Sequence, residues 1–483
     1  MSTGVIFILG KGVIPILASA VKSTWPQGSS APGFSSTATP RERNLFSVDY
    51  SDNAISASSA LSEESGQTIT PRIRGYYYFA MPQSNSLIIS WNFAYGNTRR
   101  FSSYQLYNHT PIINNNRESS YAPTAIIQYS KKFAHNNTIQ TSLMSFNTVY
   151  HTNYEGTYNG LQKLLSSENM LFLEYMQNWK NGLSLYSRMG VSYVVGRLNG
   201  VNSLEQWNPR LGLQLQYKIR DRHSASIEGW WGNNYPTPAS SNSAIVRSNE
   251  LLWLEGNPGL RNTAFITAAA SYTYIPSNIL SLSATAEYHG FLNKTAHEYF
   301  SRTGYDGLIR KEINSGDFHN ITGYMSATLK LFENSLSLKA SGGAARMEGT
   351  GIDAQSMNFI MANLQANYFI NKLSFVLYYS TPKKNLAPFD YGFRYRYKST
   401  YGVRMNYSAG DFKMTFQFHN WFNSYRYYAD FDSERYSAHG WRWVDDLARS
   451  VQLTLSYTFP YGKKVKRNHE ISVEESVESA ILK

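Results

Sequence analysis

Short and long connections alternate along this 483-residue sequence, with amphipathic segments between them, from about residue 72 to residue 460. The short connections fall at Pro82–Asn85, His135–Asn137, Lys180–Gly182, Asp221–His223, Pro276–Asn278, Glu333–Asn334, Asn371–Lys372 and Ala409–Asp411. The long ones fall near residues 97–122, 151–167, 198–207, 233–262, 291–316, 343–355, 381–399 and 420–447. The segments are therefore joined by short connections at one end and by long connections at the other. That asymmetry is typical of a transmembrane β-barrel, which has tight periplasmic turns and extended extracellular loops.

The amphipathic segments show the two-residue period of β-strands. In the clearest runs apolar residues occupy one face and Gln, Asn, Thr or Lys the other, and these runs begin at Leu211, Ile321, Ala362, Phe412 and Val451. Each run covers about ten to fifteen residues, whereas roughly nine to eleven are enough to cross a bilayer at a tilt. The polar residues would be poor core residues in a soluble sandwich, but they fit a water-filled lumen.

A count of the segments predicts an all-β fold, an antiparallel transmembrane β-barrel of about 18 strands. The eight short hairpins give sixteen strands, and Ala448–Phe459 adds a seventeenth. A barrel with both chain ends in the periplasm needs an even number, so we predict one more strand at Asn44–Ser51, before a polar loop over residues 52–70. Ser433–Val444 is interpreted as an extension of an extracellular hairpin.

Three regions follow from this count: an irregular N-terminal segment over residues 1–43, the barrel over 44–460, and a periplasmic C-terminal tail over 461–483. Ala18–Ala20 follows an apolar stretch and is of the small-residue kind that signal peptidase cleaves. However, no positive charge precedes the apolar stretch, and Lys11 interrupts it. The first region is thus either a signal peptide or the remnant of upstream sequence.

Composition excludes several classes of protein. Aromatic residues make up 15% of the chain and charged residues only 16%, a balance that suits a β-rich membrane protein with interfacial Tyr and Trp. The mean hydropathy of −0.40 and the absence of long apolar runs exclude a helical membrane bundle. Without cysteine the chain has no disulfides, zinc–thiolate clusters or thiol nucleophiles. The net charge of +12 is scattered, so nucleic-acid binding is not predicted.

No catalytic, cofactor or metal site is predicted, and the chain is not expected to be an enzyme, because it carries none of the phosphate-loop, dinucleotide, HExxH or GxSxG patterns. The acidic run Asp430–Glu434 has oxygens for Ca²⁺ but lacks EF-hand spacing, which favours a solvated loop. Asp445 and Asp446 near His439 have the groups for water activation, although a polar loop is the favoured interpretation. The acidic residues of the tail are interpreted as solvated: Glu474, Glu475 and Glu478.

Aromatic residues supply two further sets of candidates. The first set consists of candidates for interfacial girdles, each of which is also a common strand residue: Trp91, Trp230, Trp231, Tyr378 and Tyr379. The second set lies in the long connections: Tyr104, Tyr107, Trp421, Tyr425, Tyr427 and Tyr428. Aromatic faces in such loops stack on sugars, but they suit a girdle or an adhesive loop equally well. The ligand-binding residues therefore stay unassigned.

Two segments resemble TonB-dependent outer-membrane receptors. The run Trp253–Leu260 (WLEGNPGL) resembles the GNP-x-L segment that precedes a mid-barrel strand in these receptors. The end of the sequence, from Tyr457–Arg467 (YTFPYGKKVKR) to Ser479–Lys483 (SAILK), resembles the terminus of the Bacteroidetes-type outer-membrane β-barrel proteins. The resemblance implies a 22-stranded barrel with an N-terminal plug and a TonB-contacting segment, which imports a bulky nutrient.

The sequence departs from this family pattern, because residues 1–43 leave no room for a plug or for four more strands. We therefore expect a partial receptor of the Gram-negative outer membrane that lacks the plug and whose coupling to TonB is in doubt. Its barrel is then either one of about 18 strands or an incomplete one of 22. The expected partners are outer-membrane lipid, a nutrient ligand of unknown identity and a surface lipoprotein. Two alternatives remain open: a plugless passive porin, and a secreted carbohydrate-binding β-protein, although the forty-residue repeats of a propeller are missing.

Overall fold

The computed structural model describes the backbone of residues 28–46, 60–106, 108–133, 136–386, 394–421, 426–432, 437–443, 450–458 and 479–482. These residues form strands and their connections, which confirms the predicted all-β class. Within these ranges no helix is long and apolar enough to cross a membrane.

Eighteen strands of the described residues form one antiparallel sheet, in which consecutive strands of the sheet are neighbours in space. In spatial order they are β1 (Gly28–Phe46), β2 (Ala60–Met81), β3 (Asn85–Leu106), β4 (Ile112–Lys132), β5 (Asn137–Tyr154), β6 (Gly160–Asn178), β7 (Leu183–Leu198), β8 (Val201–Ile219), β9 (His223–Asn234), β12 (Thr263–Ser277), β13 (Leu280–Leu292), β16 (Phe318–Leu331), β17 (Leu336–Gly349), β18 (Gln355–Ile370), β19 (Leu373–Ser380), β22 (Thr400–Ala409), β23 (Phe412–His419) and β26 (Ser450–Tyr457). The number agrees with the predicted count.

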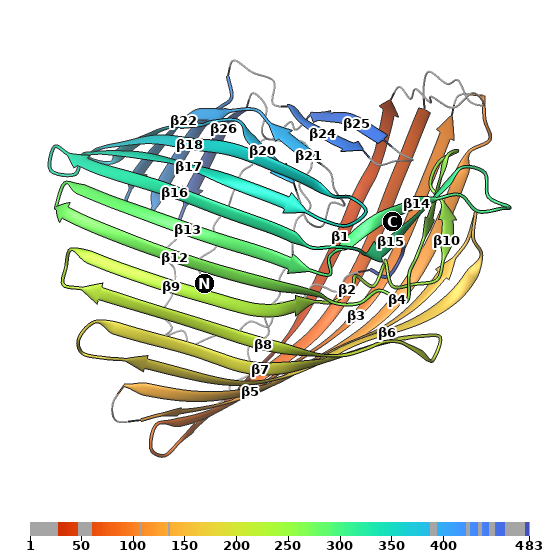
Figure 1. Ribbon diagram of the computed structural model, residues 1–483, viewed down its shortest axis with the longest axis horizontal. Helices are drawn as coiled ribbons and strands as arrows, with labels where there is room; N and C mark the ends of the chain where they lie inside the picture. The colour runs from red at the N-terminus through yellow and green to blue at the C-terminus, as the bar shows by residue number, and fades with distance from the viewer. Residues whose placement is uncertain are drawn as a thin grey trace.

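Two four-stranded sheets are built from the long connections. The first contains β10 (Ile245–Arg247), β11 (Leu252–Glu255), β15 (Leu308–Asn314) and β14 (Thr295–Phe300), and β11 pairs with β15 in parallel. The second contains β20 (Lys383–Leu386), β21 (Arg394–Tyr397), β24 (Arg426–Asp432) and β25 (Ser437–Trp443). We call the first of these sheets the inner cap, because the large sheet curls around it in Figure 1.

The first two strands differ from the prediction. The strand expected at Asn44–Ser51 is instead β1, which begins at Gly28, so the whole described part of the expected irregular segment 1–43 is strand. Likewise β2 begins at Ala60, inside the expected polar loop 52–70. The Ser, Thr and Pro content of β1 is typical of an irregular segment, which is why the strand was not predicted. Pro is nevertheless tolerated in strands at an edge or a bulge. Among the described strands β1 pairs only with β2, and its register shifts between Thr39 and Glu42, around Pro40.

The eight short connections are confirmed as tight hairpins, and those of β8 to β18 lie together at the left of Figure 1. Asn136 and Asn371 have positive φ in these turns, a conformation that Asn tolerates better than most residues. Several expected long loops are wrong in detail, because the strands continue into them. β3 and β4 stay paired from Asn85↔Lys131 to Tyr104↔Ile112, so most of residues 97–122 is a tall hairpin.

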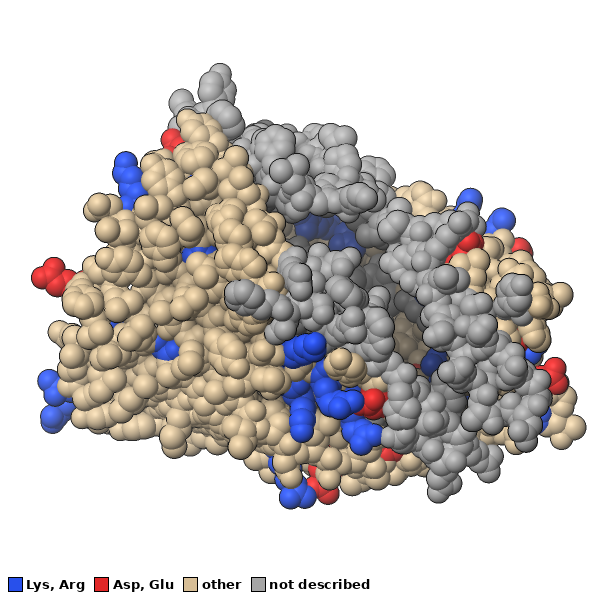
Figure 2. Space-filling view, turned by 90° about the horizontal axis from the view of Figure 1, so that it is seen from above, with Lys and Arg blue, Asp and Glu red and all other residues tan. Residues whose placement is uncertain are grey.

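The two faces of the sheet have opposite character, as the alternation predicted. On β4 the exposed side chains include Ile113, Tyr121 and Ile127. The buried ones on the same strand include Asn116 and Glu118. A soluble sandwich would bury the apolar face instead, so the sheet has the inside-out polarity of a membrane barrel wall. In Figure 2 the charged side chains are sparse over the broad uncharged surface and collect toward its edges.

Candidate functional site in the lumen

The polar face of the sheet, which we call the lumen wall, carries acidic groups that are matched by arginine. Glu168 on β6 accepts a hydrogen bond from Arg210 on β8 at 2.5 Å, and both side chains are mostly buried. Glu174, further along β6, lies 3.0 Å from Arg188 on β7. Paired charges of this kind avoid the desolvation cost of a lone buried carboxylate. They therefore belong to the structure of the wall.

The inner cap is tied to the lumen wall by hydrogen bonds at the end of the sheet that carries the long connections. Asn114 on β4 accepts a hydrogen bond from Thr157 Oγ1 (2.6 Å) and donates one to the carbonyl of Arg247 on β10 (3.1 Å). The Arg247 amide donates to Thr157 Oγ1 at 3.0 Å, and the Ser243 amide donates to Gln162 Oε1 on β6 at 3.2 Å. Because each of these groups is polar and at least partly buried, the bonds hold the cap at a fixed position in the lumen.

The GNP segment forms the corner between the cap strand β11 and the wall strand β12. The Asn257 side chain donates to the carbonyl of Glu312 at 2.9 Å and accepts from the amide of Gly259 at 3.0 Å. A Cβ at Gly256 would meet the carbonyl oxygen of Asn242 at 2.3 Å, so this position needs glycine. Leu260 is fully buried. The motif therefore builds the cap and is not itself placed as a ligand site.

Four residues near the end of the sequence, Ser479–Leu482, lie at the cap and contact the wall. The Ala480 amide donates to Glu118 Oε2 on β4 at 2.8 Å, and Tyr154 OH on β5 donates to the Ala480 carbonyl at 3.2 Å. Ile481 is fully buried in the cluster that joins cap and wall. Glu118 and Tyr154 lie toward the end of the sheet with the long connections, so these four residues lie at that end, and the periplasmic placement of the tail 461–483 stays a prediction. The sequence signal for this burial was the apolar run Ala480–Leu482 in an otherwise charged tail.

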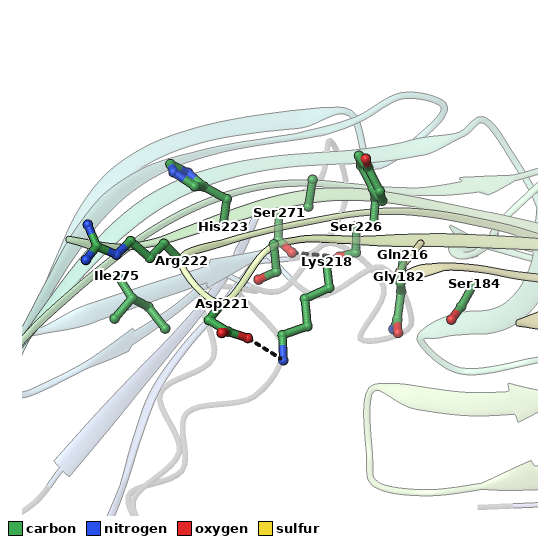
Figure 3. A pocket seen from close by; sticks show the side chains of 13 residues that line it. Gly182, Ser184, Gln216, Lys218, Asp221, Arg222, His223, Ser226, Ser271 and Ile275 are labelled. Carbon is green, nitrogen blue, oxygen red and sulfur yellow. Dashed lines mark hydrogen bonds and ion pairs between the residues drawn. The ribbon is translucent and has the colours of Figure 1, made fainter. Parts of the chain in front are cut away.

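A polar cavity of about 620 Å³ opens at the other end, beside the tight hairpins (Figure 3). Its lining includes Gln216, Ser226 and Ser271 from β8, β9 and β12, and the two serine hydroxyls lie 2.7 Å apart. Lys218 and Asp221 form an ion pair at 3.8 Å, and both side chains are exposed. An exposed pair contributes little to stability. The cavity has the character of a water-filled mouth of the lumen.

The predicted girdle residues divide between the two faces. Trp91, Trp231 and Tyr379 lie on the apolar outward face, as predicted. Trp230 and Tyr378 are corrections, because both lie on the lumen face. Trp230 packs against the ring of Tyr186 with 5.8 Å between centroids, and Tyr378 OH is hydrogen-bonded to His419 Nδ1. Successive strand residues point to opposite faces, so neighbours such as Trp230 and Trp231 cannot share a girdle.

The aromatic residues of the long connections are not gathered into one cluster among the described side chains. Tyr104 is buried on β3, and Trp421 stacks on Phe418 with 4.3 Å between centroids. The guanidinium carbon of Arg396 lies over the ring of Tyr428 on β24, 5.6 Å from the centroid of that ring. The others, Tyr107, Tyr425 and the side chain of Tyr427, lie outside the described residues.

Only some residues of the candidate acidic sites are among the described side chains. Asp430 accepts a hydrogen bond from Arg396 at 2.8 Å, so an arginine occupies one of its oxygens. Among the described side chains no group of three or more residues is arranged to hold a metal ion. The remaining candidates lie outside the described side chains: Asp432, Ser433, Glu434, His439, Asp445, Asp446, Glu474, Glu475 and Glu478.

Solved structures with the same fold are outer-membrane receptors and transporters. The chain is similar to the unliganded ferric citrate transporter FecA, with 12% identity, 90% of this chain and 71% of that chain covered, and a TM-score of 0.56. The copper transporter OprC gives 9% identity, 90% and 76% coverage and a TM-score of 0.56. The siderophore receptor PirA from Pseudomonas aeruginosa gives 11% identity, 90% and 77% coverage and a TM-score of 0.51. No family model and no curated protein matches the sequence.

These likenesses show a fold like that of TonB-dependent outer-membrane receptors. The chain adds its own physical argument for the membrane, since large apolar side chains stay exposed along one face of almost every wall strand. A soluble protein rarely exposes apolar surface on that scale. The fold and the apolar face together place the chain in the outer membrane, as predicted.

Proposed function

We propose that this chain takes up a nutrient ligand across the outer membrane as a receptor-type barrel. The observation that carries the proposal is folded structure within the lumen, where the inner cap and Ser479–Leu482 are hydrogen-bonded to the wall at the end with the long connections. An open diffusion pore needs an unobstructed aqueous channel. A receptor instead needs structure within the lumen that holds a ligand and moves when the ligand passes.

The similar structures support the nutrient part of the proposal. Their names describe transport of ferric citrate and copper and the reception of siderophores. The finer parts, a receptor of Bacteroidetes type and a partner lipoprotein on the cell surface, rest on the resemblance of the sequence motifs. Coupling to TonB would need a plug and a TonB-contacting segment, and the proposal makes no use of either.

Conductance separates the receptor from the passive porin. The purified full chain is inserted into planar bilayers and into liposomes for swelling assays with small sugars. We expect small or absent conductance and no swelling if the cap, which is bonded to the wall within the lumen, leaves no continuous channel. A stable open channel of high conductance in the unmodified protein would contradict the receptor and favour the porin.

Growth tests the uptake itself. Cells of the source bacterium with the gene deleted are compared with complemented cells under limitation for iron, for copper and for complex glycans. We expect a growth defect under one of these limitations that the full gene restores. Equal growth and equal ligand accumulation in every condition would overturn the proposal, as would recovery of the protein from the soluble fraction without detergent.

A further inference from the structure

Ser479–Leu482 lies at the opposite end of the sheet from the point where the preceding strand, β26, ends. β26 runs from the His419↔Ser450 pair to the Phe412↔Tyr457 pair, and the Thr458 amide donates to the carbonyl of Asp411 in a tight hairpin. Ala480 nevertheless contacts the end of the sheet that carries the long connections. The twenty residues between them, 459–478, reach up to about 70 Å when extended, so the separation is easily bridged. The four residues are thus brought back to the cap.

The backbone of this segment is held by side chains of the wall and cap. The Ala480 amide donates to Glu118, which also accepts from Thr152 Oγ1 at 2.9 Å. The Ala480 carbonyl accepts from Tyr154 OH at 3.2 Å and from Asn242 Nδ2 at 3.4 Å. Tyr154 OH in turn accepts from the amide two residues later, at Leu482 (3.3 Å). The Tyr154 phenol therefore contacts a carbonyl and an amide of the same short peptide segment. These contacts are made to the backbone and do not depend on side-chain identity.

Side-chain pockets supply the selectivity that the backbone bonds lack. Ala480 is 2% exposed and packs with Tyr150 and Leu164 of the wall. Ile481 is 0% exposed and lies in a cluster that includes residues from four strands: Tyr154 of the wall strand β5, Leu252 and Leu254 of β11 and Tyr299 of β14 in the cap, and Phe431 of β24. The first pocket admits a small residue and the second a branched apolar one. The first pocket lies on β5 and β6, and the second lies where wall, cap and β24 meet.

We propose that wall and cap form a peptide-binding site in the lumen, and that its occupant is this chain's own Ser479–Leu482 segment. The site takes an extended peptide with a small residue followed by a branched apolar residue. Because the segment is tethered, its effective concentration is high and it excludes a free peptide of the same sequence. Occupation also locks the cap to the wall, since Ile481 fills the space between them. The site is independent of which nutrient the barrel carries, and its test measures peptide binding, not transport.

A labelled peptide Ser-Ala-Ile-Leu-Lys, the sequence of residues 479–483, tests the site in the full chain in detergent. We expect little binding to the unmodified protein and saturable binding to the variant Ile481→Asp, whose own segment is expelled. The peptide with Asp in place of Ile should bind neither protein. As a matched control, Ile352→Asp places the same charge on an exposed connection residue and should leave the site occupied. Adding Tyr154→Phe to Ile481→Asp should weaken peptide binding roughly tenfold, because two hydrogen bonds are lost.

A second measurement keeps the proposal testable if Ile481→Asp fails to fold. The chain has no cysteine, so Leu164→Cys with Ala480→Cys introduces one pair, which a short thiol crosslinker should join. The control pair combines Ala480→Cys with Leu161→Cys, which points away from the lumen and is 79% exposed, and it should stay unjoined. Equal crosslinking of both pairs, or no crosslinking of the first, would overturn the proposal. So would equal binding of the peptide to the unmodified and Ile481→Asp proteins.

Discussion

His297 lies on β14 in the inner cap, outside the wall strands, with its ring edge-on to Tyr299 at 6.2 Å between centroids. Burial lowers the pKa of His297 well below its usual value, and the nearby charge of Arg310 lowers it further. The folded state therefore holds the ring neutral, whereas the unfolded state binds a proton below about pH 6.5. The stabilising contribution is complete above that pH and is lost as the pH falls, by roughly 1.4 kcal/mol for each pH unit.

This sign predicts that acid loosens the cap. Hydrogen exchange of the β14 amides should be clearly faster at pH 5.0 than at pH 7.5, after correction for the intrinsic rates. The variant His297→Gln removes the titrating ring and should show a much weaker dependence on pH. If the variant keeps the full dependence, another group is responsible.

Also at the scale of single residues, a buried ion pair joins two of the long connections. Lys294 Nζ lies 2.5 Å from Asp353 Oδ1, and the two side chains are 3% and 4% exposed. Removal of one partner leaves a buried charge unpaired, so Asp353→Asn should cost about 3–5 kcal/mol. The exposed pair of Arg346 and Glu348 offers the matched control, and Arg346→Gln should cost less than about 1 kcal/mol. Denaturant-dependent proteolysis of these connections measures both, and equal costs would contradict the prediction.

At the scale of elements, β8 and β9 meet at a close approach of backbone and ring. A Cβ at Gly212 on β8 would lie 2.4 Å from the ring of Trp230 on β9, whereas a Cβ at Gly229 would meet only a carbonyl oxygen at 3.7 Å. Gly212→Ala should therefore cost about 1–3 kcal/mol and change the Trp fluorescence, because the ring must move.

The neighbouring substitution Gly229→Ala is the control and should be close to neutral. Thermal unfolding and fluorescence spectra of the two variants, compared with the unmodified chain, measure the difference. Replacing Trp230 by a smaller residue should rescue Gly212→Ala. If both alanine variants lose the same stability, the ring contact is not the cause.

The wall strands could be predicted from the sequence because their pattern is local. Alternation along Leu211–Ile219 and tight turns such as Asn371–Lys372 fix the strand and its hairpin without any knowledge of the rest. The same alternation puts Trp230 and Trp231 on opposite faces, so it contradicts the prediction that both belong to a girdle. The start of β1 could not be predicted, because Ser and Thr residues that pair with β2 have no pattern of their own.

The candidate site lay beyond such reasoning, because it forms between segments that are distant in the sequence. Glu118 falls in an expected loop, and its contact Ala480 lies 362 residues away. Nothing in the spacing of either residue indicates the other. The apolar Ile481 in a charged tail shows that the tail needs a partner surface, but not which end of the sheet supplies it.

At the scale of the whole molecule, the outward face of the wall determines how the chain sits in lipid. Leu213 lies well inside β8, points outward and is 50% exposed, whereas its neighbour Gln216 points into the lumen. Arginine on the lipid face of a barrel costs about 2–4 kcal/mol at the midplane of the bilayer. Because the wall has one apolar face and one polar face, the cost of a charge should depend on the face that carries it.

Leu213→Arg should therefore reduce the fraction of chain that folds into liposomes at equilibrium, by an amount that corresponds to about 2–4 kcal/mol. Gln216→Arg places the same group on the same strand but in the water-filled lumen, and should change folding by less than about 1 kcal/mol. Urea titration of folding into liposomes, followed by heat-modifiable gel mobility, measures both variants. Equal penalties would show that Leu213 does not face lipid, and the outward apolar face would then need a different partner, such as a second protein.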